Sequence, residues 1–257
     1  MQDAHATFSI LILATQYMFN VTFAGMFAAT IYFIMERNNL TPRYSVIASL
    51  CMMVVCIAAI NYYHMAAGVG LDGQYATLSR FPTAFRYADW VLTTPIILSS
   101  LVMLTNSPNK GGLAAKLMIA DAVMIILGYI GEVVTNEAGG GTTTSWVCFL
   151  AACGGFVYIL VVMYGELSEA AADFPTDLRS TFGLLQNFIL ISWMTYPIGY
   201  LAPLLGYKGE LLAVRELVYC IADLSSKVGF GILVVSLAKK LSLLEIEQRE
   251  KYIAQSR

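Results

Sequence analysis

The chain has 257 residues, of which 58% are hydrophobic and only 12% are charged. This charged fraction is about half that of an ordinary soluble domain, which excludes a soluble enzyme or binding domain. The net charge of −2 provides no basic surface of the kind that nucleic-acid binding requires. The composition therefore predicts an integral protein of the lipid bilayer, with no nucleic acid as a partner.

Seven segments are long and apolar enough to cross a bilayer, which takes about 20 mainly apolar residues each. They cover residues 8–35, 44–67, 83–105, 114–136, 145–165, 180–203 and 212–239. No soluble domain interrupts them, so the predicted fold is an all-α bundle of seven transmembrane helices that forms one domain over residues 1–257. The tail LSLLEIEQREKYIAQSR is expected to extend the last span as a surface helix.

Basic residues predict the orientation, because they are enriched in cytoplasmic loops. With the N-terminus outside, ten basic residues face the cytoplasm and three face outward, namely Arg80, Lys208 and Arg215. We therefore expect a multi-pass protein of the plasma membrane with a cytoplasmic C-terminus. The five cysteines all fall in apolar segments, so we interpret them as small buried side chains and predict no metal site.

The third segment, FRYADWVLTTPIILSSLVML, carries polar residues inside an apolar span. Arg86, Asp89, Thr93 and Ser100 follow each other at three, four and seven residues, which places them on one face of a helix. At 1.5 Å per residue, Asp89 and Ser100 lie about 16 Å apart in depth. Ionisable residues inside a membrane are costly and mark functional sites, so this face predicts a charged functional centre.

The last span contains DLSSK, in which Asp223 and Lys227 share a helix face. Each of these residues costs roughly 2.5–3.5 kcal/mol at the centre of a bilayer, so both are expected to face the interior of the bundle. A buried amine of this kind can form a Schiff base with an aldehyde, and carboxylates can serve as its counterions. The residues predict a site that holds a carbonyl cofactor and moves a proton.

The sixth span contributes Trp193, Tyr196, Pro197 and Tyr200, again at helical spacing. This pattern is typical of an aromatic packing face with a proline kink. It is equally compatible with the wall of a cavity for a long apolar cofactor, to which Trp90 would also contribute.

Three motifs, RYADWVLTTP, the WxxYPxxY run over 193–200 and DxxxKVGFG over 223–231, together resemble those of the microbial (type 1) rhodopsins. The resemblance covers nearly the whole chain. It implies all-trans retinal bound as a Schiff base to Lys227. It also implies that Asp89 is the primary counterion and proton acceptor, and that Asp223 is the second counterion.

The same resemblance assigns further roles. Thr93 would be the hydrogen-bonding partner of Asp89, Arg86 the gate of the outer half-channel, and Tyr62, or alternatively Tyr63, the partner of Asp223. The residues expected to line the retinal pocket are Trp90, Thr94, Met124, Phe149, Trp193, Tyr196, Pro197 and Tyr200. We also expect a homo-oligomer, either a trimer or a pentamer.

The chain departs from the family pattern at several positions. Ser100 stands where outward proton pumps commonly carry a carboxylic proton donor, and a hydroxyl cannot store and release a proton near neutral pH. Asn61 stands where proteorhodopsins have a histidine paired with the counterion, while His64 is expected to have a surface or packing role. Arg215, beside Glu216, stands where some relatives have a glutamate, which leaves the outer release group open.

Ile97 corresponds to the colour-tuning position of the family, and an aliphatic residue there predicts green absorption. The favoured function is a light-driven outward proton pump without a carboxylic donor, and not an enzyme. A photosensor that signals to a partner is the first alternative, because many sensory relatives lack the donor. An inward proton pump is less favoured because Asp223 is kept, and a chloride or sodium pump is disfavoured by Asp89.

Overall fold

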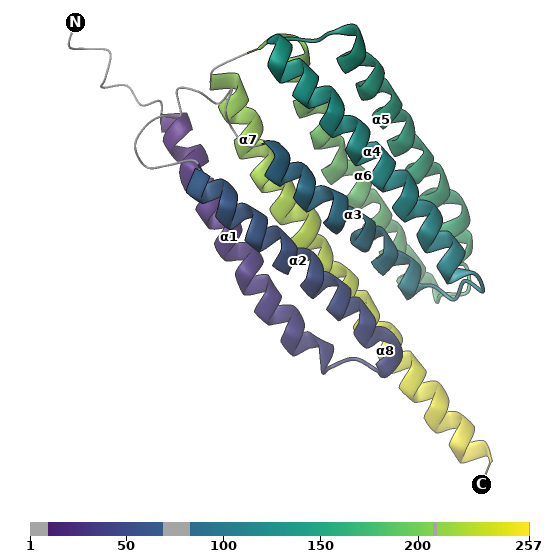
Figure 1. Cartoon of the computed structure of the whole chain (residues 1–257). Coiled ribbons are helices and arrows are strands. Elements are labelled where there is room, and N and C mark those ends of the chain that lie inside the picture. The colour runs from purple at the N-terminus through teal and green to yellow at the C-terminus, as the bar shows by residue number, and fades with distance from the viewer. Residues whose placement is uncertain (1–9, 69–82, 208–209, 257) are drawn as a thin grey trace, which may run out of the picture.

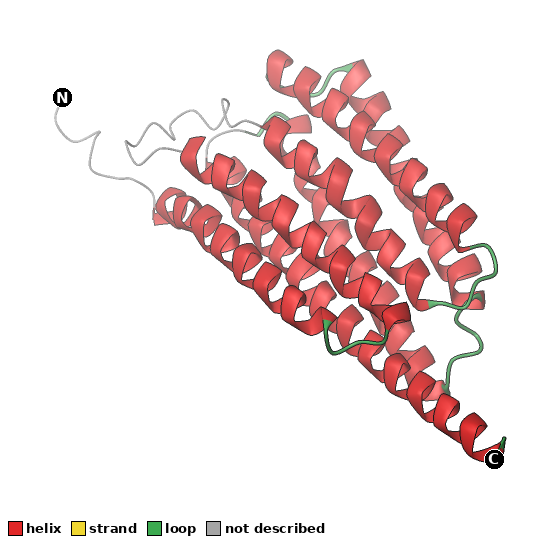
Figure 2. Cartoon of the chain, turned by 60° about the horizontal axis from the view of Figure 1, so that its bottom comes forward, coloured by secondary structure: helices red, strands yellow, loops and turns green. Residues whose placement is uncertain are grey.

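A computed structural model describes residues 10–68, 83–207 and 210–256, and these residues form helices without any strand (Figure 2). The helices are α1 (Ile10–Arg37), α2 (Pro42–Gly68), α3 (Thr83–Leu104), α4 (Lys110–Ala138), α5 (Thr143–Val162), α6 (Thr176–Leu204), α7 (Glu210–Asp223) and α8 (Phe230–Gln255). Two π-helical turns supplement them: Met163–Leu167 extends α5, and Leu224–Gly229 joins α7 to α8. Because α7 and α8 form one continuous rod, the bundle has the seven rods that the sequence predicted (Figure 1).

Six of these rods are long and apolar enough to cross a membrane, judged on the described residues. The remaining rod, α6, reaches spanning length with 29 residues, but it is less apolar and contains Pro197 and Pro203. The predicted tail helix is confirmed, since α8 continues to Gln255 and projects beyond the bundle (Figure 1).

Local capping explains why α4 is longer than the predicted span 114–136. The side chain of Asn109 accepts a hydrogen bond from the Gly112 amide at 3.1 Å, which starts the helix one turn early. At the other end, Gly139 adopts the left-handed conformation with φ of 71°, which terminates the helix after Ala138. Hydrophobicity alone does not reveal either of these two helix ends.

Helices that follow each other in the chain pack side by side from α1 to α5, α6 packs on the α7–α8 rod, and this rod closes the bundle against α1. The α7–α8 rod also contacts α2 and α3. This arrangement encloses α3, so the polar face predicted on this helix points into the protein rather than into lipid. We call the end where α1, α3 and α7 begin the upper end, and the end where α8 leaves the bundle the lower end (Figure 1).

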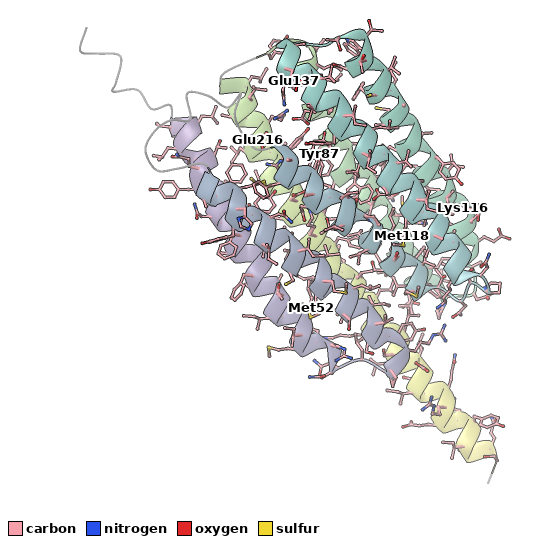
Figure 3. All side chains as sticks on the ribbon, viewed as in Figure 1. Met52, Tyr87, Lys116, Met118, Glu137 and Glu216 are labelled. Carbon is pink, nitrogen blue, oxygen red and sulfur yellow. The ribbon has the colours of Figure 1, made fainter. Side chains whose placement is uncertain are left out.

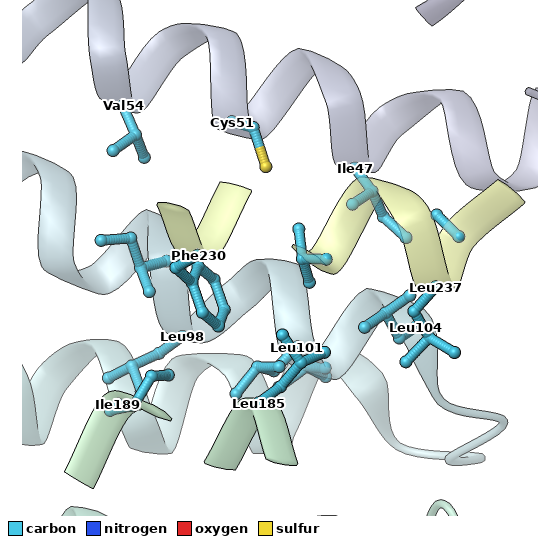
Figure 4. Packing of buried hydrophobic residues seen from close by; sticks show 14 of the residues in the cluster. Ile47, Cys51, Val54, Leu98, Leu101, Leu104, Leu185, Ile189, Phe230 and Leu237 are labelled. Carbon is cyan, nitrogen blue, oxygen red and sulfur yellow. The ribbon is translucent and has the colours of Figure 1, made fainter. Parts of the chain in front are cut away.

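The lower half of the bundle has an apolar core. Leu98, Leu101 and Leu104 of α3 pack near Phe230 and Leu237 of α8, with further contributions from α2 and α6 (Figure 4). Lipid chains are as apolar as these side chains, so close packing rather than the hydrophobic effect holds the helices together here. The charged residues of the interior lie at the middle of the bundle and above it.

Candidate functional site

Lys227 occupies the centre of the bundle on the π-helical turn between α7 and α8, and only 2% of its surface is exposed. Its Nζ lies 3.0 Å from Asp89 Oδ2 and 3.0 Å from Asp223 Oδ1. Both carboxylates are fully buried. The structure thus brings the predicted amine and its two predicted counterions together, one from α3 and one from the same rod.

The two carboxylates have different surroundings, and Asp223 accepts more hydrogen bonds from the protein than Asp89 does. Tyr62 Oη donates to Asp223 Oδ2 at 2.7 Å, and Tyr196 Oη donates to Oδ1 at 2.5 Å. Trp90 Nε1 donates to Oδ1 at 3.1 Å. Three fixed donors from α2, α3 and α6 therefore favour the ionised form of Asp223. Tyr62 makes this contact, whereas the alternative, Tyr63, is exposed.

Asp89 lacks such donors. Among the described residues, neither of its carboxylate oxygens accepts a hydrogen bond, and the lysine ammonium is its partner. Thr93 is a hydrogen-bonding partner of Asp89 as predicted, but its hydroxyl donates to the backbone oxygen of Asp89, at 2.8 Å, and not to the carboxylate. Lys227 is therefore the cation in contact with Asp89, whose carboxylate has fewer partners in the protein than that of Asp223.

Arg86 lies above this pair. Its Nη1 donates to Tyr62 Oη at 3.1 Å and lies 4.0 Å from Asp223 Oδ2. Its Nη2 donates to Glu216 Oε2 at 2.5 Å. The predicted gate residue therefore connects the central site to a second carboxylate nearer the upper end.

A buried network of charged groups continues from Glu216 towards the upper end. Arg215 donates to Glu216 Oε1 from Nη2 at 2.7 Å and to Glu132 Oε1 from Nη1 at 3.0 Å. Tyr87 Oη donates to the other oxygen of Glu132 at 2.8 Å. Figure 3 labels Tyr87 on α3 and Glu216 on α7, both in the upper half of the bundle. The count of outward-facing loop charges placed Arg215 in a loop, and this was wrong: it is a buried residue of α7.

An apolar cavity lies beside the central site, between α3, α4, α5 and α6. Its walls include all eight residues predicted to line a pocket, namely Trp90, Thr94, Met124, Phe149, Trp193, Tyr196, Pro197 and Tyr200. Trp90 and Tyr196 both line the cavity and bond to Asp223, so the cavity adjoins the Lys227–Asp223 pair. Trp193 Nε1 is buried and has no partner among the described residues. This aromatic slot next to a buried amine fits a long apolar aldehyde attached to Lys227.

Ser100 lies in the lower half with 1% of its surface exposed, and its hydroxyl donates to the Ile97 backbone oxygen at 2.6 Å. A small cavity is lined by Ser100 and Lys227 together, and Cys51 also contributes to its wall. The buried carboxylates among the described residues are Asp89, Asp121, Glu132, Glu216 and Asp223. None of these is among the residues that line this cavity, so no described buried carboxylate takes the donor's place beside Ser100.

Two interior carboxylates escaped the sequence analysis, Asp121 and Glu132, both on α4. Thr94 Oγ1 donates to Asp121 Oδ2 at 2.6 Å, which ties α3 to α4 beside the cavity. The signal was available, because KLMIADAVMIILGYIGEVV is an apolar span that contains two acidic residues. The rule that singled out Asp89 applied equally to this span.

Asn61 and His64, at which the sequence differs from the family pattern, contact only a few neighbouring groups among the described residues. Asn61 Nδ2 donates to the Ile57 backbone oxygen within its own helix at 3.0 Å. His64 is exposed, and its ring stacks on Phe85 with the centroids 5.3 Å apart, in agreement with the expected surface or packing role.

The fold and the site define a seven-helix membrane protein built around a buried lysine held between two carboxylates. The family model described as "Bacteriorhodopsin-like protein" matches residues 13–241, and the chain belongs to this family of microbial rhodopsins. The crystal structure of Exiguobacterium sibiricum rhodopsin is 42% identical, with a TM-score of 0.85 over 90% of this chain and 98% of that one. The structure of xanthorhodopsin, described as a light-driven ion pump with dual chromophore, is 30% identical, with a TM-score of 0.84 over 92% of this chain and 96% of that one.

Among curated relatives, the green-light absorbing proteorhodopsin of gamma-proteobacterium EBAC31A08 is 28% identical over 222 residues, which cover 85% of this chain and 84% of the relative. Membership in the family implies a retinal chromophore and a membrane environment. The relatives are light-driven ion pumps rather than enzymes, and the family predicted from the three motifs is confirmed.

Proposed function

We propose that the protein is a light-driven outward proton pump that carries all-trans retinal on Lys227. The chemistry that the chromophore supplies when bound is light absorption followed by isomerisation. The protein supplies the proton path. Asp89, 3.0 Å from the Lys227 nitrogen, accepts the proton, and Asp223 stays ionised throughout.

The observation that carries this proposal is the difference between the two carboxylates. Asp223 has donors from Tyr62, Tyr196 and Trp90, which stabilise its negative charge. Asp89 has no donor among the described residues other than Lys227. A proton that leaves the Lys227 nitrogen therefore goes to Asp89, since protonation of Asp223 would disrupt three hydrogen bonds to an ionised acceptor.

The proposed direction rests on the asymmetry of the bundle. Above the site, Arg86 and Glu216 offer a polar route to the upper end, which the distribution of basic residues assigns to the outside. Below the site, Ser100 lies in an apolar core and cannot deliver a proton itself. Protons would then return to the Lys227 nitrogen from cytoplasmic water, with the protein inserted in the plasma membrane.

The decisive experiment measures light-induced pH changes in a suspension of cells that express the protein with added retinal. We expect the medium to become more acidic in the light and a protonophore to abolish this change. The matched control is Asp89→Asn, which should cause no light-induced pH change. Alkalinisation of the medium that a protonophore abolishes would establish inward transport instead.

A photosensor is the second candidate, because no buried carboxylate among the described residues lines the cavity beside Ser100. A pump without a donor recovers slowly, and a long-lived active state suits signalling to a partner. A normal photocycle without any pH change in the same cell suspension would favour the sensor.

A further inference from the structure

Arg215 lies between two buried carboxylates and contacts both. It donates from Nε at 3.0 Å and from Nη2 at 2.7 Å to Glu216 Oε1, and from Nη1 at 3.0 Å to Glu132 Oε1. The remaining oxygens also have donors: Arg86 Nη2 lies 2.5 Å from Glu216 Oε2, and Tyr87 Oη lies 2.8 Å from Glu132 Oε2. Each of the four carboxylate oxygens therefore faces a donor.

This pattern of hydrogen bonds bears on the protonation state of the two glutamates. A carboxylic acid needs an acceptor for its own O–H, and a guanidinium group has only donors. Three of the four oxygens face a guanidinium, so a proton on any of these would meet another donor. The fourth, Glu132 Oε2, faces the Tyr87 hydroxyl, which would have to turn its own proton away to accept one. Each glutamate also contacts at least one guanidinium, as a buried anion requires, and these donors together favour the ionised carboxylates.

Most of the neighbouring titratable groups are uncharged. Tyr219 lies between the two guanidinium groups, with its ring centroid 5.2 Å from Arg86 Cζ and 5.7 Å from Arg215 Cζ. Tyr62, Tyr200 and Cys220 also adjoin the network, and all of these are neutral near neutral pH in their ordinary state. The one further anion at the network among the described residues is Asp223, 4.0 Å from Arg86 Nη1, and it has Lys227 at 3.0 Å as its closer cation.

We propose that Arg215 is a positioning residue that keeps Glu132 and Glu216 ionised, so that this network stores no proton and the pump releases its proton late. The proposal rests on the proposed function as an outward pump. In the wild-type protein the proton that reaches the outer medium is the one that Asp89 accepted, and it leaves when the Asp89 O–H bond breaks at the end of the cycle. Release therefore follows uptake from the cytoplasm.

Removal of the guanidinium reverses this order. In Arg215→Gln, Glu132 and Glu216 would share a single cation, Arg86, and one of them would bind a proton in the dark. Once Asp89 is neutral, Arg86 is more strongly attracted to the glutamates, and the stored proton dissociates from its carboxyl oxygen into water. Release then precedes uptake.

The test is a flash experiment on the purified full chain reconstituted with retinal. A pH-indicator dye in the bulk solution records release, and visible absorbance records the loss and return of the proton on the Lys227 nitrogen. We expect late release in the wild type and in Arg215→Lys, and early release in Arg215→Gln. The double variant Arg215→Gln/Glu132→Gln removes one charge of each sign and should restore late release.

Infrared difference spectra of protein with isotopically labelled glutamate provide a second readout that does not depend on transport. In Arg215→Gln only, we expect a carbonyl band that shifts with the isotope label and disappears in the light, because it belongs to a glutamic acid that loses its proton. Early release or such a band in the wild type would overturn the proposal even if Arg215→Gln fails to fold. Late release without the band in a folded Arg215→Gln would also overturn it.

The two proposals fail differently. If no variant releases protons but the band is present in Arg215→Gln alone, the outward pump is rejected while the role of Arg215 in ionising the glutamates is supported. If cells acidify the medium but the order of release does not respond to Arg215, the pump is supported and the role of Arg215 is rejected.

Discussion

Replacement of Asp89 by asparagine tests the central site most directly. The substitution keeps the shape of the side chain and removes one of the two negative charges that face Lys227. Each carboxylate lies 3.0 Å from Nζ. At an effective dielectric constant of about 20, a single ion pair at this distance is worth about 5.5 kcal/mol. The ion pair between Asp223 and Lys227 remains in this variant. The positive charge on the nitrogen is therefore still compensated, and the chromophore should still bind.

Excitation moves positive charge away from the Lys227 nitrogen, so a nearby anion stabilises the ground state more than the excited state. Loss of the Asp89 charge should therefore lower the excitation energy by a fraction of the pair energy, on the order of a few kcal/mol. We expect Asp89→Asn to absorb to the red of the wild type and to transport no protons, because the acceptor is gone. Absorption spectra of the purified variant and pH changes in illuminated cells measure the two effects.

The matched comparison is Asp223→Asn. Its amide NH2 would replace one of the two carboxylate oxygens and would face either Tyr62 or the pair Tyr196 and Trp90, which donate to the native carboxylate. Leaving buried donors without acceptors costs about 1–3 kcal/mol each, so this variant should lose mainly thermal stability and yield. If Asp89→Asn pumped like the wild type with an unchanged spectrum, the assignment of Asp89 as acceptor and main counterion would be refuted.

Three further substitutions test separate parts of the structure. Lys227→Ala, expressed with added retinal, should show no visible band that survives washing, and a hydroxylamine-sensitive band in this variant would contradict the attachment site. After a flash, the return of the proton to the Lys227 nitrogen in the wild type should slow as pH rises, roughly in proportion to proton concentration. In Ser100→Asp this return should be faster and should depend less on pH. A fast, pH-independent return in the wild type, measured by flash spectroscopy, would show that another donor exists. Gly199→Ala should lower thermal stability by about 1–3 kcal/mol through overpacking, because a Cβ there would lie 2.5 Å from the ring of Tyr219. Gly183→Ala on the same helix meets nothing within 4 Å and should be neutral or stabilising, so equal melting temperatures of the two variants would speak against close packing at Gly199.

The fold was predictable from sequence because the bilayer imposes one simple requirement, a run of apolar residues long enough to cross it. That requirement located all seven rods within a few residues. It failed at the ends of helices, where Asn109 and Gly139 act through hydrogen bonds and backbone conformation rather than hydrophobicity. It also gave no information on the homo-oligomer, which stays a prediction together with the membrane orientation.

The central site was predictable to a similar degree, since Asp89, Asp223 and Lys227 are ionisable residues in apolar spans. Their mutual distances follow from how α3 packs on the α7–α8 rod, which helical spacing within one segment cannot give. The network of Glu132 and Arg215 was missed for the same reason. Arg215 lies near the start of a helix and looks like a loop charge until tertiary structure pairs it with α4.

The contrast between the two halves of the bundle has an electrical consequence. The upper half contains charged groups and dipoles around Arg86 and Glu216, so it is more polarisable than the lower half, which is apolar around Leu98 and Leu101 and behaves as an insulator. A membrane voltage drops mainly across the insulating part of a series of layers. In the proposed outward pump, most of the electrical work, about 2.3 kcal/mol per charge for each 100 mV, would therefore fall on the return of the proton from the cytoplasm. The membrane potential should accordingly slow that step of the cycle and leave the transfer to Asp89 almost unaffected.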